Sequence, residues 1–220
     1  MRPVKVVLTV LMTLATAGLL AACAGLQTVD QLRQKAEQGD VNALFRLGTM
    51  YDYGRSVPQD YQEAAKWYRQ AAERGYVRAQ VNLGNMYISG RGVAQDYKEA
   101  MECFRQAATQ GDAVAQYNFG LMYAKGQGVA QDYKEAGKWY RQAAEQGFAG
   151  AQFNLGVMYE KGQGVPQDYV EAVKWYRKAA EQGDMRAQSN LGSMYRQGWG
   201  VQQDYQEAAK WFRKAAGVGQ

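Results

Sequence analysis

The chain has 220 residues, of which 47% are hydrophobic, so it is long and apolar enough to bury a core. It contains no histidine, which excludes Ser–His or Cys–His nucleophilic catalysis and histidine-ligated zinc. The formal net charge is +5, but no run of Lys or Arg concentrates it, so we do not expect a nucleic-acid partner.

The N-terminal residues have the organisation of an export signal. Arg2 and Lys5 begin the chain, residues 6–20 are apolar, and small residues precede Cys23. A basic start, a short apolar stretch and small residues before a cleavage point are typical of a secretory signal, and the stretch is short for a membrane span. We therefore expect residues 1–22 to be a signal peptide that is removed.

The tetrad Leu20-Ala21-Ala22-Cys23 resembles the bacterial lipobox. The resemblance implies that the Cys23 thiol is diacylglycerated and its new amine acylated, and several acyl chains anchor a protein firmly to a membrane. An ordinary cleaved signal that happens to contain a cysteine is the alternative. Ala24 stands where an Asp would favour the inner membrane, so the resemblance implies an outer-membrane lipoprotein facing the periplasm, with surface exposure as the other outcome. The lipid anchor is then the sole contact with the membrane.

Cys103 is the second of the two cysteines. If Cys23 is acylated in an oxidising compartment, Cys103 has no partner for an internal disulfide, and the fold must depend on packing. We interpret Cys103 as a buried thiol; a redox-active or intermolecular thiol is the alternative.

A period of 36 residues organises the rest of the chain. Glycines and tyrosines recur at this spacing without a slip, at Gly39, Gly75, Gly111, Gly147, Gly183 and Gly219 and at Tyr51, Tyr87, Tyr123, Tyr159 and Tyr195. The spacing predicts five repeats over 40–219, with boundaries at 40–75, 76–111, 112–147, 148–183 and 184–219. Residues 23–39 precede them as a lipidated N-terminus and a capping helix, because Leu32 aligns with Tyr68 of the first repeat.

Each repeat is predicted to form two helices, called A and B. In the first repeat, helix A runs from about Asp40 to Tyr53, and Gly54 provides a left-handed C-cap. Asp60 then begins helix B, with Glu63 at the offset of a capping box. This Asp/Glu pairing recurs in every repeat, and its place before each helix favours capping over an acid/base pair.

The apolar residues of both helices have the 3.6-residue period of a buried stripe. Helix A also contains Gly48, although glycine inside a helix costs about 1 kcal/mol relative to alanine. It recurs at Gly84, Gly120, Gly156 and Gly192. We expect each of these glycines to permit close approach of a neighbouring helix, with an aromatic ring beside it.

The recurring pattern A-x3-LG-x-MY-x2-G-x2-V-x2-D-x3-A-x2-WY-x2-AA-x2-G is similar to the Sel1-like repeat, a relative of the tetratricopeptide repeat, and covers residues 40–219. The resemblance implies an all-α fold: an α-solenoid of five antiparallel helix pairs that forms a right-handed superhelix, with stability shared between adjacent repeats. Three residues depart from the pattern. Ser56 replaces a turn glycine, Cys103 a tryptophan and Phe119 a leucine.

Helix A positions equivalent to 42, 45, 49 and 52 vary freely between repeats and lie along one side of the helix. Because helix A lines the concave surface in related solenoids, the resemblance implies a groove there for a protein or peptide ligand. The candidate groove residues are Phe45, Arg78, Val81, Asn82, Tyr117, Asn118, Leu121, Phe153, Asn154, Val157, Arg186 and Asn190. Its centre is apolar and aromatic, which suits an extended or helical peptide.

Two alternatives remain open for these candidates. The aromatic residues of the groove are also suited to the core between repeats. The Asn series Asn82, Asn118, Asn154 and Asn190 can clamp a ligand backbone, as in peptide-binding relatives, or donate a structural hydrogen bond to the adjacent repeat. Arg46 interrupts this series in the first repeat.

The sequence therefore predicts a non-catalytic interaction scaffold, an adaptor in the bacterial cell envelope, with no cofactor and no metal. A surface-exposed virulence factor that binds host protein is one alternative, and a regulator of a peptidoglycan or polysaccharide enzyme is another. We also expect the last repeat to present a partly apolar face, from Trp211, Phe212 and Ala215, that supports weak self-association.

Overall fold

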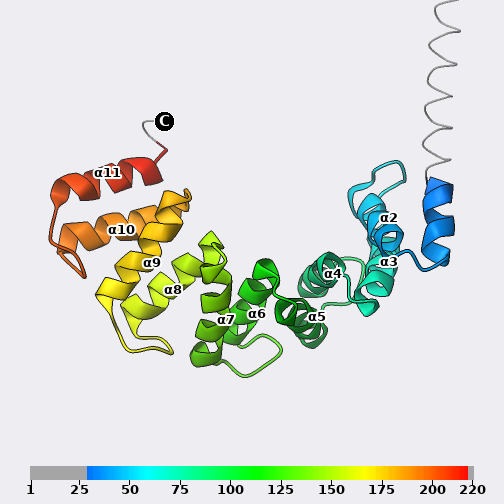
Figure 1. Ribbon diagram of the computed structural model, residues 1–220, viewed down its shortest axis with the longest axis horizontal. Helices are drawn as coiled ribbons and strands as arrows, with labels where there is room; N and C mark the ends of the chain where they lie inside the picture. Colours follow the sequence, from blue (N-terminus) through cyan, green and yellow to red (C-terminus); the bar gives the residue numbers. More distant parts are fainter. Residues whose placement is uncertain (1–28, 218–220) are drawn as a thin grey trace, which may run out of the picture. The chain divides into compact units, whose positions relative to one another are not determined.

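The computed structural model describes residues 29–217, and every regular element in that range is an α-helix (Figure 1). A helix over residues 29–37 comes first. Ten helices follow as five A/B pairs: α2 Val41–Tyr53 with α3 Tyr61–Glu73, α4 Val77–Ser89 with α5 Tyr97–Thr109, α6 Ala113–Lys125 with α7 Tyr133–Glu145, α8 Ala149–Lys161 with α9 Tyr169–Glu181, and α10 Met185–Gln197 with α11 Tyr205–Ala215. The all-α solenoid of five helix-pair repeats is confirmed; the hand of its superhelix remains a prediction. Of the helices described, none has the length and apolar character needed to cross a membrane.

The chain forms two compact units, and the boundary between them in the sequence lies between Gln95 and Asp96. The first contains the helix over 29–37 and helices α2 to α4, and the second contains α5 to α11. Within each unit, every helix from α2 onward packs against the next one along the chain. Each unit is therefore a stack of near-neighbour contacts, the arrangement expected of repeats that cannot bury both faces of one pair alone.

The predicted caps define the helix ends. Asp60 accepts hydrogen bonds from the N–H groups of Gln62 and Glu63 at 2.9 and 3.0 Å, and Gly54 ends α2 with φ 65°. The capping box is only half formed, because the Asp60 N–H donates to the Tyr51 carbonyl at 3.0 Å. The Glu63 carboxylate accepts instead from Lys66 at 2.9 Å. The start of helix B is thus tied to the end of helix A.

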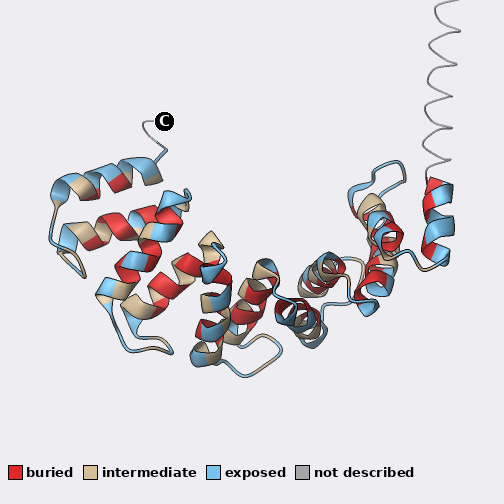
Figure 2. Ribbon diagram, in the orientation of Figure 1, coloured by how far each residue is buried: buried red, intermediate tan, exposed pale blue. Residues whose placement is uncertain are grey.

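The core is built from alanine of both helices, leucine and methionine of the A helices and aromatic rings of the B helices. Figure 2 shows the buried residues as stripes along the helices. The helical glycines are confirmed as points of close approach. A Cβ atom on Gly48 would lie 2.5 Å from Cδ1 of Tyr68, whose side chain is fully buried. The same contact recurs at Gly120 with Tyr140, Gly156 with Tyr176 and Gly192 with Phe212. Each glycine makes room for an aromatic ring of its own repeat.

The second turn glycine has a different reason. Gly128 has φ 75°, and a Cβ there would lie 2.6 Å from the Tyr97 carbonyl oxygen, at the start of helix B of the preceding repeat. Gly92, Gly164 and Gly200 have the same relation to Tyr61, Tyr133 and Tyr169. Ser56 keeps the left-handed conformation, with φ 63°, although it is not glycine. Close backbone contact, and not φ alone, therefore explains why the four later turns need glycine.

Polar contacts join successive repeats. Arg141 and Arg177 on B helices donate to the hydroxyls of Tyr159 and Tyr195 on the following A helices, at 2.5 and 2.6 Å. The helix over 29–37 follows this pattern, because its Arg33 donates to Tyr51 at 2.5 Å and its Val29, Leu32 and Ala36 are buried. It therefore packs as the B helix of a preceding repeat would.

Buried glutamines form a second link between repeats. Gln152 is 4% exposed, and its amide donates to the Ala144 carbonyl at 3.1 Å. Its own side-chain oxygen accepts from Gln182 at 2.7 Å. Gln116 repeats this arrangement with the Ala108 carbonyl and Gln146. These paired amides satisfy polar groups that would otherwise be costly to bury.

The aromatic position of helix B lies in the core, as expected. Trp175 and Trp211 are buried, and Trp67 and Trp139 are half-buried. Cys103 occupies the equivalent position in the second repeat and is buried, which confirms our interpretation of its environment.

Candidate partner-binding site

The predicted groove residues all lie on A helices, and none of them is buried. Arg78 and Arg186 are exposed, and the other ten, Phe45, Val81, Asn82, Tyr117, Asn118, Leu121, Phe153, Asn154, Val157 and Asn190, are half-buried. Phe45, Arg78, Val81 and Asn82 belong to the first compact unit, and the other eight belong to the second. The predicted lipidation site, Cys23, lies outside the described residues.

Three of these residues, from three successive A helices, lie together in the second unit. The Arg186 guanidinium of α10 lies over the Phe153 ring of α8, with 4.3 Å between the guanidinium carbon and the ring centroid. The Tyr117 side chain of α6 also lies close enough to Arg186 to contribute to the raised pKa of the guanidinium. We call Tyr117, Leu121, Phe153, Val157 and Arg186 the central patch. It is an apolar and aromatic surface with one cation fixed above it.

Asp184 holds Arg186 in place. The Arg186 guanidinium donates to the Asp184 carboxylate at 2.7 Å, and Asp184 also caps the N-terminus of α10. Burial alone would raise the pKa of Asp184, but hydrogen bonds from Arg186 and from the Ala187 N–H lower it overall. The pKa of Arg186 is raised, chiefly by its hydrogen bond to Asp184. Both groups are therefore charged at neutral pH, and the cation over Phe153 is permanent.

The aromatic rings of the patch also pack on the core. Tyr117 lies with its centroid 5.8 Å from that of Tyr140 and 5.0 Å from that of Phe148. Phe153 lies 5.8 Å from Tyr176. The two interpretations of these residues are thus compatible, because each ring rests on the core and keeps part of its surface exposed. Such rings are held in one orientation, which lowers the entropic cost of using them in a contact.

The first unit has a smaller aromatic group of the same kind. Phe45 lies 5.8 Å from Tyr68 and 4.8 Å from Tyr76, centroid to centroid. Val81 and Asn82 are half-buried on the next A helix, α4. The first unit therefore offers a surface of similar chemistry but without a cation stacked over the phenylalanine.

The asparagine series divides into two groups. Asn82, Asn154 and Asn190 interact with the side chains of Tyr68, Tyr140 and Tyr176 on the preceding B helices, where each amide opposes the effect of burial on the tyrosine pKa. This supports the structural interpretation for these three. At the equivalent position before Asn118 the chain has Phe104, which offers no hydroxyl. Asn118, next to Tyr117, is therefore the asparagine best suited to contact a ligand.

Reasoning from the sequence did not foresee the role of position 52. Position 52 varies between repeats, which predicts a surface residue. In the structure, however, Asp52 is 7% exposed and accepts a hydrogen bond from the Tyr68 hydroxyl at 3.2 Å. Glu160 accepts from Tyr176 in the same way. The signal was present in the sequence, since an acid sixteen residues before a tyrosine occurs in the first and fourth repeats.

The last repeat differs in part from the expectation of an apolar face. Trp211 is 7% exposed and belongs to the core with Tyr176 and Leu191, so it does not contribute to such a face. Phe212 is half-buried beneath Arg196, whose guanidinium carbon lies 5.6 Å from the ring centroid. Ala215 is half-buried. Self-association through this repeat remains a prediction, and it has less apolar surface to draw on than expected.

The Sel1 repeat family model matches five consecutive segments, at residues 41–76, 77–112, 113–148, 149–184 and 186–218. This chain belongs to the Sel1 repeat family. Proteins of this family are generally protein-interaction scaffolds and are typically not catalytic. In residues 29–217, moreover, no three acidic or cysteine side chains gather as metal ligands.

Solved structures agree with this assignment. A protective antigen of uropathogenic Escherichia coli with an SLR fold is 43% identical, with a TM-score of 0.84, over 87% of this chain. The match covers 41% of that antigen, so this chain spans about two fifths of its length. A Sel1 repeat protein from Oxalobacter formigenes is 33% identical, with a TM-score of 0.79, over 91% of this chain and 85% of its own. No match was found among curated proteins.

Proposed function

We propose that this Sel1 repeat protein is a non-catalytic scaffold that binds a protein or peptide on its A-helix surface, with the central patch as the main contact. The observation that carries the proposal is the meeting of Tyr117, Phe153 and Arg186 from three successive A helices. Rigid aromatic residues and arginine dominate binding energy in protein interfaces. Asn118 adds a side-chain amide beside them that can bond to a ligand backbone.

We further propose that Cys23 anchors the protein in the bacterial cell envelope, in the outer membrane with the repeats facing the periplasm. The lipobox-like tetrad before Cys23 supports this. Replacing Cys23 with alanine should move the protein from the membrane fraction to the soluble fraction. Mass spectrometry of the N-terminal peptide should show acyl chains on Cys23 in the unaltered protein, and an unmodified residue 23 would contradict the anchor.

The interaction surface can be tested with paired asparagine variants. Asn118→Ala should weaken partner binding and leave the melting temperature unchanged, because no tyrosine hydroxyl stands at the equivalent position before it. Asn154→Ala should lower the melting temperature, because Asn154 interacts with the Tyr140 side chain. The partner is captured with a photo-cross-linking residue at position 121, and cross-linking at exposed Glu145 on the B helix α7 is the control.

Introducing a negative charge into the apolar part of the central patch provides the decisive measurement. Phe153→Glu and Tyr117→Glu should abolish the cross-link from position 121, whereas Lys134→Glu, at an exposed residue of the B helix α7, should not. Circular dichroism establishes that each variant is folded. Equal cross-linking from positions 121 and 145, or retention of the cross-link in folded Phe153→Glu, would contradict the central patch.

A second candidate differs in where the protein is displayed. The Escherichia coli relative is described as a protective antigen, which supports surface exposure, the location required of a virulence factor that binds host protein. Protease treatment of intact cells separates the two locations. Degradation of the repeats without permeabilisation supports surface display, and protection until the outer membrane is opened supports the periplasm.

A further inference from the structure

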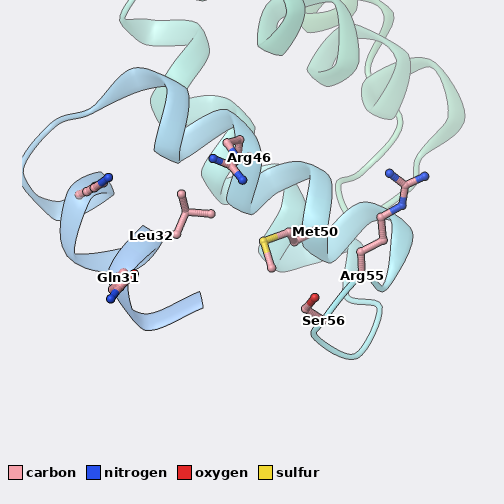
Figure 3. Close-up of a pocket in the computed structure, with 7 residues that line it drawn as sticks. Gln31, Leu32, Arg46, Met50, Arg55 and Ser56 are labelled. Carbon is pink, nitrogen blue, oxygen red and sulfur yellow. The ribbon is translucent and has the colours of Figure 1, made fainter. Parts of the chain in front are cut away.

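A pocket of about 370 Å³ lies in the first compact unit, between the helix over residues 29–37 and α2 with its following turn (Figure 3). It is lined by Gln31, Leu32, Lys35, Arg46, Met50, Arg55 and Ser56. Three of these residues are cationic and none is acidic. In Figure 3, Leu32 and Met50 lie next to each other below Arg46, and Arg55 and Ser56 border them on the turn. We call this the basic pocket.

The residues that give the basic pocket its charge and polarity are departures from the repeat. Arg46 stands where the other four repeats have asparagine. Lys35 stands where the later B helices have Ala71, Ala107, Ala143 and Ala179, all fully buried. Ser56 stands where the later turns have glycine. At three separate positions around this pocket, the residue typical of the repeat is therefore replaced by one with a charged or hydroxyl donor. The packing of the repeats does not require these donors.

These donors fit a phosphate group better than a smaller anion. Arg46, Lys35, Ser56 and Gln31 line the pocket with N–H and O–H donors. A phosphate monoester, which has three charged or strongly accepting oxygens, can accept from more of these donors than the two oxygens of a carboxylate can. Arginine forks bind phosphate in a bidentate manner. Arg55 is held at the border by the Tyr53 ring, 5.2 Å from its guanidinium carbon. We propose that the basic pocket binds a phosphate group.

The phosphate monoester has two sources, a soluble phosphate ester or the headgroup of phosphatidic acid, a phospholipid whose phosphate is also a monoester. The helix with Gln31, Leu32 and Lys35 begins six residues after Cys23, and six residues reach at most about 20 Å. A lipid anchor on Cys23 would therefore keep the basic pocket close to headgroups. This choice of source rests on the anchor proposed above, whereas recognition of phosphate does not. Leu32 and Met50 add apolar surface on which the body of either ester can rest.

The first test uses residues 23–220 with Cys23→Ser, a chain that retains every described residue. Glycerol phosphate is titrated at constant ionic strength and followed by NMR chemical shifts of the amides of residues 31–56. Arg46→Asn, which restores the residue of the other repeats, should weaken binding by about ten-fold or more. Lys35→Ala should weaken it in the same direction. Arg91→Gln is the control, because Arg91 occupies the position of Arg55 in the second repeat and stacks over Tyr61.

Both variants and the control lose one positive charge, so a difference between them is not an effect of net charge. Absence of saturable shifts, equal weakening by Arg91→Gln, or succinate binding as tightly as glycerol phosphate would each overturn the phosphate assignment. If Arg46→Asn does not fold, the phosphate assignment is judged from Lys35→Ala, on the helix over residues 29–37. Tyr117→Glu should leave phosphate binding unchanged, so failure of the central patch would not affect this result.

The second test distinguishes the sources. The same chain is sedimented with vesicles of phosphatidylcholine that contain phosphatidic acid, whose headgroup is a phosphate monoester. Vesicles that contain phosphatidylglycerol, a phosphodiester, serve as the comparison. Vesicle binding that falls about ten-fold in Arg46→Asn and not in Arg91→Gln assigns the lipid headgroup. Binding of glycerol phosphate without vesicle binding upholds the pocket and assigns a soluble phosphate ester. Vesicle binding that both variants reduce equally would reflect net charge and overturn the lipid source.

Discussion

The Arg177 guanidinium of α9 donates a hydrogen bond to the Tyr195 hydroxyl of α10 at 2.6 Å, and so joins the fourth repeat to the fifth. Its ring contact adds to the bond, with 5.7 Å from the guanidinium carbon to the Tyr195 centroid. In the second repeat the equivalent residue, Arg105, is bound instead by Glu102 of its own helix at 2.6 Å. Glu102 stands where the other repeats have lysine, and this one replacement redirects the arginine.

Substitution of Arg177 should therefore lower the free energy of unfolding more than substitution of Arg105, because, of the two, only Arg177 joins two repeats. Arg177→Gln should destabilise the protein by about 1 kcal/mol, the usual net value of a partly exposed hydrogen bond. Arg105→Gln should cost less, because it removes an exposed pair within one helix. Thermal melts of both variants measure the difference, and an equal fall in melting temperature would contradict the role of the Arg177–Tyr195 bond.

The same substitution should have opposite effects at two glycines of the third repeat. At Gly120 an added Cβ would lie 2.9 Å from Cδ1 of Tyr140 and 3.1 Å from the Ala136 carbonyl oxygen. Gly120→Ala should thus destabilise by about 1–3 kcal/mol through overpacking. At Gly137 the nearest atom is the terminal methyl of Met158, at 2.8 Å, which can move.

Gly137→Ala should consequently be neutral or stabilise by up to about 1 kcal/mol, the gain of alanine in a helix. Urea denaturation midpoints of the two variants test the pair. A fall of similar size in both would show that Met158 cannot adjust.

Restoring the tryptophan of the repeat should stabilise the second repeat. Cys103 is buried at the position where Trp175 and Trp211 are buried, each in the core that its own A helix forms with the preceding B helix. Because large-to-small changes of tryptophan cost about 3–5 kcal/mol, Cys103→Trp should raise the melting temperature. Cys103→Ala is the control and should not raise it. An unchanged or lower melting temperature for Cys103→Trp would contradict the prediction.

Buried tyrosines should make the fold sensitive to alkali. Burial raises the pKa of Tyr68 from 10.0 to about 12 and also raises the pKa of Tyr140. A raised pKa favours the neutral phenol in the folded state, so its contribution to stability is complete below pH 10 and falls as the pH passes from about 10 to about 12.

Tyr140→Phe should lessen this alkaline loss, since the adjacent helix A position is Ala124 and no carboxylate loses its donor. The urea midpoint measured between pH 9 and pH 12 should decline less steeply in Tyr140→Phe than in the unaltered protein. Parallel curves would show that lysine deprotonation, and not Tyr140, governs the decline.

Features that lie within a single repeat and recur in the others could be predicted from the sequence. The Asp60 cap and the Gly54 turn are local, and the ring beside Gly48 lies in the same repeat, so a regular period was enough to find them. The position of Arg33 on Tyr51 also follows from the period, once the helix over 29–37 is aligned with later B helices.

Features that depend on a particular pairing could not be predicted. Arg186 reaches Phe153 across 33 positions and Tyr117 across more, and a single sequence gives no sign of such a contact. Asp52 was interpreted as variable surface because its position differs between repeats. An acid stands there only opposite a tyrosine, at Asp52 and Glu160, but Tyr140 faces Ala124, so the facing residue alone does not determine the position.

The glycine of the second turn places a limit on how this architecture can change in length. Gly128 lies against the backbone of Tyr97 in the repeat before it, and Gly164 and Gly200 lie against the corresponding residues of their predecessors. One extra residue ahead of such a glycine would break its contact with the preceding backbone and shift the packing register of the next helix pair. Growth or shrinkage of such an array is therefore expected in whole helix pairs, by duplication or deletion of 36-residue segments.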